Sequence, residues 1–252
     1  NLVVGRKGAG KTALFIQMRD RLRRDKRNVV LDLKPEGYQL LKLKEDILAH
    51  LTQGASHHLV TAFWEYLILL EITYKLLEKD QTAHKFNHEI RDLYLELERT
   101  YYTEGYSVEG DFSERLLALS QRIAVDYGQR YGDADGTKLT TDQVTQLVYS
   151  HDIKTLRSQV NAYLEHKQGV WVLFDNLDKG WGTLWVDGVD AMVLRCLIDA
   201  GRKVERDMRK AGNSVHCLVF IRNDVYEHLM RHSADYGKEM RVTLDWAASD
   251  ML

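Results

Sequence analysis

Short apolar runs alternate along the chain with longer stretches in which apolar residues recur every three or four positions. The short runs cover residues 2–4, 28–33, 170–174, 215–221 and 241–246. Runs of this length next to turn residues predict buried β-strands. The helical spacing between them predicts helices over residues 14–22, 40–51, 59–77, 90–101, 112–127, 153–164 and 189–204, with a further helix from about residue 225. Strands separated by helices predict an α/β fold with a mostly parallel sheet.

One part of this pattern has no strand in it. Between residue 38 and residue 168 every periodic stretch is helical, whereas strands are predicted on both sides. We therefore expect an all-helical insertion at 38–168 in a core made of residues 1–37 and 169–252. Trp64, Tyr66 and Tyr74 fall on the apolar positions of that insertion, and we interpret them as its core.

The first strand leads directly into a glycine-rich segment with the pattern G-x-x-x-x-G-K-T. Its residues are Gly5, Arg6, Lys7, Gly8, Ala9, Gly10, Lys11 and Thr12. Glycines at these positions let the backbone wrap closely and direct its N–H groups at a polyphosphate. Lys11 would reach the terminal phosphates, and Thr12 would offer its hydroxyl to Mg²⁺. The helix that follows would point its positive end at the same anion.

Two later strands end in polar residues. The run 170–174 is followed by Asp175, then Asn176, Leu177 and Asp178, and the run 215–221 is followed by Arg222. Open α/β sheets bind ligands at the carboxyl ends of their strands. With a phosphate loop upstream, Asp175 is typical of a Walker B carboxylate that holds Mg²⁺, although an Asp here could also cap a helix. Arg222 would face the same crevice, or would pair with Asp224.

Composition narrows the class of protein. The net charge of −2 creates no overall field toward nucleic acid or membrane, and no apolar run is long enough to span a membrane. The cations between residues 19 and 27 are typical of a solvated helix face, so nucleic acid is not indicated. Cys196 and Cys217 fall at apolar positions, which favours buried thiols in a reducing, cytoplasmic compartment. The chain opens inside a strand, so we expect it to be part of a larger protein.

This order of motifs resembles the P-loop NTPases that place an extra strand between the phosphate loop and Walker B, the class that contains AAA+ and STAND ATPases. The segments 174–179 (FDNLDK), 220–227 (FIRNDVYE) and 244–246 (LDW) are similar to those of bacterial P-loop ATPases near the KAP and STAND groups. The resemblance implies a three-layer sandwich, with ATP and Mg²⁺ as ligands. It implies that residues 5–12 bind phosphate, that Asp175 supports the metal, and that Arg222 is a sensor of the γ-phosphate. Relatives in that neighbourhood often belong to large proteins and antiviral defence systems.

One departure from the resemblance concerns hydrolysis. Many relatives carry an acid directly after the metal-binding Asp, to orient the attacking water, and this chain has Asn176 there. Asp178 could supply that carboxylate, or hydrolysis could be slow. The leading hypothesis is therefore an ATPase that switches the conformation or assembly of a larger protein, as a homo-oligomer with sensor or effector domains outside this segment.

Three other function classes fit the sequence to different degrees. A nucleotide-binding scaffold without turnover stays open because of Asn176. A small-molecule P-loop kinase is less favoured, since such kinases are compact and this chain has a long insertion. A GTPase would need the base-reading pattern N-K-x-D, which does not occur in the sequence.

Overall fold

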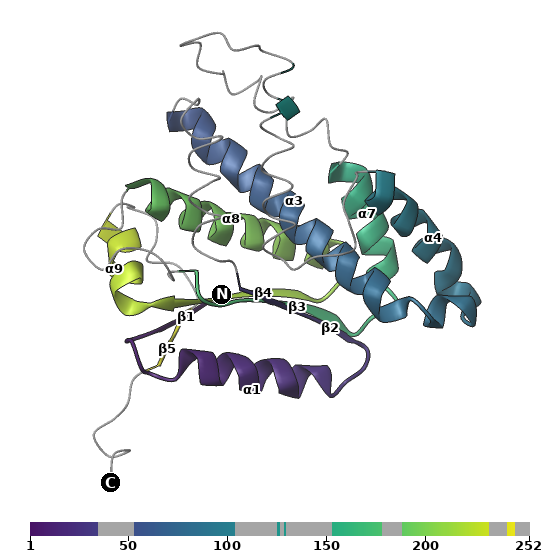
Figure 1. Cartoon of the computed structure of the whole chain (residues 1–252), viewed down its shortest axis with the longest axis horizontal. Helices are drawn as coiled ribbons and strands as arrows, with labels where there is room; N and C mark the ends of the chain where they lie inside the picture. Colours follow the sequence, from purple (N-terminus) through teal and green to yellow (C-terminus); the bar gives the residue numbers. More distant parts are fainter. Residues whose placement is uncertain are drawn as a thin grey trace.

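A computed structural model of the chain describes residues 1–34, 53–103, 125–126, 129, 153–177, 188–231 and 241–244. Its centre is a five-stranded parallel sheet in the order β2-β3-β4-β1-β5 (Figure 1). The strands are β1 (Leu2–Gly5), β2 (Asn28–Leu33), β3 (Gly169–Phe174), β4 (Val215–Arg222) and β5 (Arg241–Leu244). The predicted α/β class with a parallel sheet is confirmed, and each predicted strand is present, although residues 245–246 lie outside the described part.

The sheet order places two distant parts of the chain next to the first strand. β4 pairs with β1 on one side and with β3 on the other. The strand that ends at residue 222 thus lies between the strand before the glycine-rich loop and the strand before Asp175. Because all five strands are parallel, their carboxyl ends lie at one edge of the sheet.

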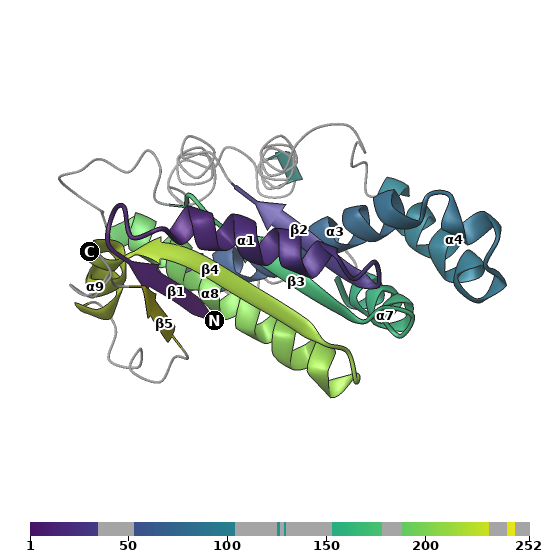
Figure 2. The same ribbon diagram turned by 90° about the horizontal axis from the view of Figure 1, so that it is seen from below.

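Among the described helices, α1 (Lys11–Arg23) alone covers one face of the sheet (Figures 1 and 2). Phe15 is fully buried and packs edge-on against Phe220 of β4, with 5.4 Å between ring centroids. The residues that share this cluster come from every second position of the central strands, as the pleat requires, and include Val3, Val30 and Leu173. The apolar stripe predicted for residues 14–22 is confirmed.

The opposite face of the sheet carries α8 (Gly188–Lys210) and α3 (Gln53–Asp80). α8 lies so close to β4 that a Cβ added to Gly201 would stand 3.2 Å from Cys217 Cβ. Two residues after the end of α8, Gly212 has a φ of +87°, which suits a glycine, and the N–H of Asn213 bonds Met208 O at 3.0 Å. With α1 below and α3 and α8 above, the sheet is the middle of three layers.

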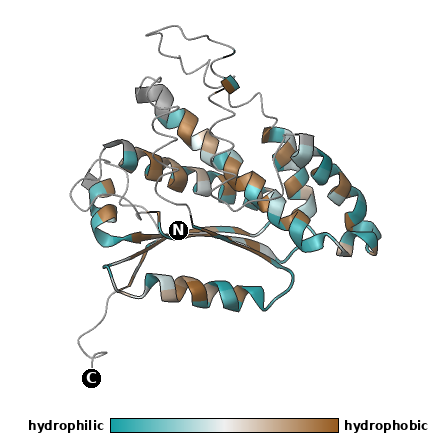
Figure 3. Ribbon diagram, viewed as in Figure 1, coloured by the Kyte–Doolittle hydropathy of each residue, from teal (hydrophilic) through white to brown (hydrophobic). Residues whose placement is uncertain are grey.

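Helix α3 is hydrophobic over most of its length (Figure 3). Its residues 62–73 are all buried, among them the predicted core residues Trp64 and Tyr66. A helix that is apolar around its circumference must be covered on all sides. α8, α7 (Ile153–Leu164), α4 (His88–Thr103) and β2 all contribute to that cover. One hydrophobic cluster therefore joins the predicted insertion to the sheet.

Two buried carboxylates fix α3 among its neighbours. Glu65 is 1% exposed and pairs with Arg157 of α7 and with Lys203 of α8, whose Nζ lies 2.6 Å away. At the far end of α3, Asp80 accepts hydrogen bonds from Tyr163 Oη at 2.7 Å and Lys167 Nζ at 2.5 Å. Burying a carboxylate is costly unless it is paired, so these contacts determine how α3 and α7 pack.

The remaining described elements are short. A 3-10 turn, η2 (Ala83–Lys85), joins α3 to α4, and α9 (Asn223–Arg231) follows β4 directly. α9 begins two residues earlier than predicted, because Asn223 and Asp224 form its first turn. Helices predicted at 59–77, 90–101, 153–164 and 189–204 are confirmed, whereas 40–51 and almost all of 112–127 lie outside the described residues. No strand occurs between β2 and β3 in the parts of that segment that the structure describes.

Candidate functional site

The loop between β1 and α1 has the backbone that its glycines predict. Gly8 and Gly10 both have φ of +84°, a left-handed conformation that residues with a Cβ rarely adopt. The N–H of Ala9 bonds Arg6 O at 3.1 Å and closes the turn. Gly5 is needed for a different reason, because a Cβ there would stand 3.0 Å from Leu244 O. The loop is therefore tightly wrapped and packed against β5.

The helix after the loop presents an uncapped, positive N-terminus. Gly10 is its N-cap, and no side chain among the described residues makes a cap hydrogen bond there. The first turn of α1 contains no acidic residue, although Asp and Glu are common at that position in helices. Arg6 and Lys7 are exposed beside it. The N–H groups of a helix N-terminus, together with the cations Arg6, Lys7 and Lys11, favour an anion as ligand.

The side chain of Lys11 is held by carbonyl groups of the loop. Its Nζ donates to Gly5 O at 2.8 Å and to Arg6 O at 2.9 Å. These contacts hold the ammonium at the beginning of the loop. The predicted phosphate-binding side chain is thus positioned at the loop, and it stays a prediction that it binds phosphate.

The structure brings Thr12 and Asp175 together over 163 residues of sequence. Thr12 Oγ1 donates to Asp175 Oδ2 at 3.2 Å. Asp175 is 3% exposed, and its N–H bonds Leu33 O at 3.1 Å, which continues the ladder between β2 and β3. A hydroxyl and a carboxylate at this spacing are oxygen donors of the kind that Mg²⁺ prefers. These two residues could hold the metal, with water and phosphate oxygens as the other ligands.

The residues after Asp175 turn away from the strand direction at once. Asn176 has φ of +63°, a conformation that Asn tolerates better than most residues, and Leu177 is buried. The turn ends β3 at the position of the carboxylate. Asp178, the predicted alternative for positioning water, lies outside the described residues.

Arg222 lies beside the start of the loop and pairs with Asp224, one of the two alternatives that the sequence left open. In the register of β1 and β4, Arg222 is opposite Gly5. Its Nε donates to Asp224 Oδ1 at 3.0 Å, and its Nη2 is also paired with Asp224. The pairing with Asp224 considered from the sequence is therefore present. Arg222 would need to exchange this carboxylate for a phosphate in order to act as a sensor.

Trp64 of α3 reaches the end of the strand that carries Asp175. Its indole is fully buried, its Nε1 donates to Val193 O at 3.2 Å, and its ring packs edge-on against Phe174 with centroids 6.4 Å apart. The sequence predicted Trp64 as core, which is confirmed, but not its contact with the neighbour of Asp175. No local signal could have revealed this contact, because 110 residues separate the two rings.

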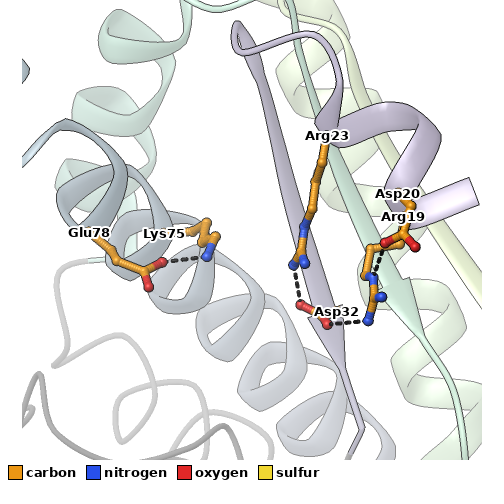
Figure 4. Close-up of polar contacts among 6 residues, drawn as sticks. All are labelled: Arg19, Asp20, Arg23, Asp32, Lys75 and Glu78. Atoms are coloured by element: carbon orange, nitrogen blue, oxygen red, sulfur yellow. Dashed lines mark hydrogen bonds and ion pairs between the residues drawn. The ribbon is translucent and has the colours of Figure 1, made fainter. Parts of the chain in front are cut away.

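The arginines of α1 lie along the flank of the sheet, away from the loop. Arg23 Nη2 lies 2.6 Å from Asp32 Oδ1 of β2, and Arg19 contacts both Asp32 and Asp20 (Figure 4). On α3, on the other face of the sheet, Lys75 pairs with Glu78. Exposed pairs of this kind contribute little to stability. The arginine face of α1 is thus largely matched by acids, as expected for a solvated helix face.

The cysteines do not form a reactive centre. Cys196 and Cys217 are free and buried. Burial raises the pKa of Cys196 to about 11 and raises the pKa of Cys217 further, so both are thiols rather than thiolates at neutral pH. Within the described residues, no three His, Cys, Asp or Glu side chains gather in a way that could hold a metal ion. No described helix has the length and apolar character needed to cross a bilayer.

Comparison with known proteins adds one distant relative. The chain is 22% identical, over 262 aligned positions that cover its whole length, to a protein of Escherichia coli (strain K12) described as "Putative transposon gamma-delta 80.3 kDa protein". It spans 34% of that relative, about a third of its length. No protein-family model and no solved structure matches the chain. The printed description mentions a transposon and no activity, so the chemistry of this chain has to be argued from its own site.

Proposed function

We propose that this chain is a P-loop ATPase domain that binds Mg·ATP between the 5–12 loop and Asp175. The observation that carries the proposal is the hydrogen bond from Thr12 to Asp175. In a P-loop NTPase the loop hydroxyl and the Walker B carboxylate share one Mg²⁺. A chance match to the loop pattern would have no reason to place a buried carboxylate beside its hydroxyl. The position of β4 between β1 and β3 supports the AAA+ and STAND class over the small-molecule kinases.

The electrostatics of the loop agree with a polyphosphate ligand. Arg6, Lys7 and Lys11 are the charged side chains of the loop and the first helical turn, and Asp175 is the carboxylate opposite them. A Mg²⁺ ion between that carboxylate and the phosphates would compensate the negative charge on both sides. Asp175 is 163 residues from Thr12 in the sequence, and the pairing of the strands brings its negative charge next to the cations of the loop.

The test of ATP binding compares two alanine substitutions of basic residues on α1, one in the proposed site and one at the other end of the helix. Labelled ATP is titrated into wild type, Lys11→Ala and Arg21→Ala, with and without Mg²⁺. Removing the Lys11 ammonium beside desolvated phosphates should cost about 2–5 kcal/mol, so its affinity falls at least about thirtyfold. Arg21 lies exposed at the other end of α1, and its variant should bind as wild type does. Equal affinities for wild type and a folded Lys11→Ala variant would reject the site.

Metal dependence separates Asp175 from the loop. Asp175→Asn keeps the size of the side chain but removes its charge, so Mg²⁺ should no longer strengthen ATP binding. The Mg²⁺-free affinity should change little, because the loop itself is intact. If Mg²⁺ strengthens binding equally in wild type and Asp175→Asn, the carboxylate is not a metal residue.

The second candidate function is a nucleotide-binding scaffold that does not hydrolyse ATP, and Asn176 is the specific observation that favours it. The residue occupies the position of the usual acid and has a left-handed backbone. ATP turnover is measured for wild type and Asp178→Asn. Turnover that falls in the variant while ATP affinity is kept supports Asp178 as the group that positions water. Absence of turnover in the whole protein that contains this segment would favour the scaffold.

We further propose that nucleotide controls the assembly of the larger protein through Arg222. In the structure Arg222 is held by Asp224. A guanidinium can form two parallel hydrogen bonds with either a carboxylate or a phosphate, which a lysine cannot. A contact made with ATP and lost with ADP gives the differential binding that a switch requires. A full population shift needs about 5.5 kcal/mol, so contacts between subunits must add to this one.

Light scattering tests this switch. The mass of the larger protein is measured with ATP, with ADP and without nucleotide, for wild type, Arg222→Lys and Asp224→Asn. We expect an ATP-dependent mass in wild type that is lost in Arg222→Lys and kept in Asp224→Asn. A wild-type mass that does not depend on nucleotide would end the switch hypothesis. A nucleotide-dependent mass that persists in Arg222→Lys would remove Arg222 from it.

A further inference from the structure

The edge of the sheet opposite the phosphate loop carries a band of cations, which we name the basic rim. It is formed where α1, α3, α7 and α8 end and where β2, β3 and β4 begin, on the right-hand side of Figures 1 and 2. Strands of six residues separate it from the loop edge by about 20 Å. Its members are Arg24, Lys26, Arg27, Lys79, Lys167, Arg209 and Lys210.

Hydrogen bonds show that the basic rim is continuous although its residues come from four parts of the chain. The N–H of Gln168 donates to Arg27 O at 3.1 Å, which joins the connection before β3 to the connection before β2. The N–H of Val170 donates to Ser214 O at 2.8 Å, which adds the connection before β4. Lys79 Nζ donates to Asn28 O at 2.9 Å and ties the end of α3 to the same edge.

Cations outnumber acids along this edge, and two of its three acids are paired with its own cations, whereas Glu165 is exposed. The segments 24–28, 79–80, 165–168 and 209–214 contain seven Lys and Arg but three Asp and Glu, in a chain whose net charge is −2. Of the three acids, Asp25 pairs with Arg27, and Asp80 is buried against Lys167. Lys26, Arg209 and Lys210 are exposed, and none of them forms an ion pair within the part of the chain that the structure describes.

The cations are also close enough to affect one another. Partial burial lowers the pKa of Lys79 below its ordinary value, and the charge of Lys167 lowers it further. Some of these residues have a second role, since Lys79, Arg209 and Lys210 stand in the last turns of α3 and α8, where they stabilise the carbonyl ends of those helices. Lys26 and Arg27 follow the end of α1 in a connection, so helix ends do not account for the whole excess.

An aromatic pair lies beside these charges. Trp171 of β3 and His216 of β4 are directly paired on adjacent strands, and their rings stack with centroids 4.1 Å apart. Both rings are half-buried, and burial lowers the pKa of His216 below its ordinary value, with a smaller contribution from the charge of Arg209. Seven residues after Lys79, directly after η2, Phe86 is 82% exposed, which is unusual for a ring of that size.

We propose that the basic rim binds single-stranded nucleic acid, with its cations on the phosphates and with Phe86 and the Trp171–His216 pair available to bases. Proteins that bind single strands combine a cationic track with aromatic rings on which bases stack. The rings distinguish this partner from duplex, whose bases are already stacked. A single exposed Phe between η2 and α4 is too small an apolar surface to favour a membrane. This inference concerns a different edge from the phosphate loop and does not depend on ATP binding.

The test uses fluorescence anisotropy with a labelled 20-nucleotide single strand, a duplex of the same length, and anionic vesicles as competitor. The rim variant carries Lys26→Glu, Arg209→Glu and Lys210→Glu. The control variant carries Arg99→Glu, Lys154→Glu and Arg202→Glu, which changes the net charge equally at exposed positions outside the rim. We expect the rim variant to bind the single strand at least about tenfold more weakly. The slope of log K against log [salt] should become shallower by about two, because three phosphate contacts are lost. We expect the control variant to bind nearly as wild type does.

A second measurement covers the case in which the rim variant does not fold. Lysine acetylation of the wild-type protein is mapped by mass spectrometry with and without the single strand, and Lys26 and Lys210 should be protected while Lys154 is not. Equal loss of binding in both triple variants, or equal protection of all three lysines, would show general charge attraction and overturn the proposal. Stronger binding of the duplex, or displacement of the protein onto vesicles, would overturn the assignment to single strands.

Discussion

Trp64 offers the sharpest test of how the helical segment is connected to the candidate site. Replacing it with Leu removes the hydrogen bond to Val193 O and the edge contact with Phe174 in a fully buried position. A lost hydrogen bond costs about 1 kcal/mol and a large-to-small change in a core about 2–5 kcal/mol, so we expect a total loss near 3 kcal/mol. For a chain of this length that lowers the Tm by about 6–12 °C.

The same substitution should also weaken the binding of Mg·ATP. Phe174 immediately precedes Asp175 on β3, so a ring that no longer packs against Trp64 leaves the carboxylate less firmly placed. An aromatic pair contributes about 0.5–1.5 kcal/mol. If that contribution is expressed at the site, the affinity for Mg·ATP falls about two- to tenfold.

The control is a substitution of similar cost that is far from the loop. Leu97 of α4 is fully buried, and Leu97→Ala should cost about 3 kcal/mol. Thermal unfolding and ATP titration are carried out on both variants under conditions in which both are folded. We expect a weaker ATP affinity in Trp64→Leu only. If the two variants bind Mg·ATP equally well, the contact between Trp64 and Phe174 is one of packing alone and the reasoning is wrong.

Three further predictions concern stability. Gly5→Ala should be more destabilising than Gly8→Ala in thermal unfolding, because a Cβ at Gly5 meets Leu244 O at 3.0 Å, whereas Gly8 has open space and loses only the roughly 1–2 kcal/mol of a left-handed backbone; a smaller effect at Gly5 would contradict this. Glu65→Gln should cost about 3–5 kcal/mol in urea unfolding, since it leaves two cations beside a neutral amide, and a neutral outcome would show that water reaches them. For Cys196, the raised pKa favours the protonated thiol in the folded state, so its contribution is present below the ordinary pKa of 9.0 and is lost as the pH rises toward about 11. Urea unfolding across that range should show a steeper loss in wild type than in a Cys196→Ala variant, and identical slopes would reject the shift.

The order of elements and the conformation of the glycine-rich loop could be predicted from sequence because their signals are local. A run of apolar residues such as 170–174 specifies a buried strand through hydrophobic burial alone, and the spacing of Leu14, Phe15 and Met18 specifies one helical face. The loop is equally local, since Gly8 and Gly10 are required where the backbone adopts a positive φ. These residues determine conformation within a few positions of themselves, so no knowledge of the fold was needed to read them.

The rest depended on which strands became neighbours. Asp175 was a candidate from its place at a strand end, but only the parallel sheet brings it to Thr12, and only the packing of α3 brings Trp64 to Phe174. The basic rim is the clearest case. Its cations are scattered over 187 positions and look like ordinary solvated helix ends in the sequence. They form one surface because parallel strands all begin at the same edge, which is a property of the sheet and not of any segment within it.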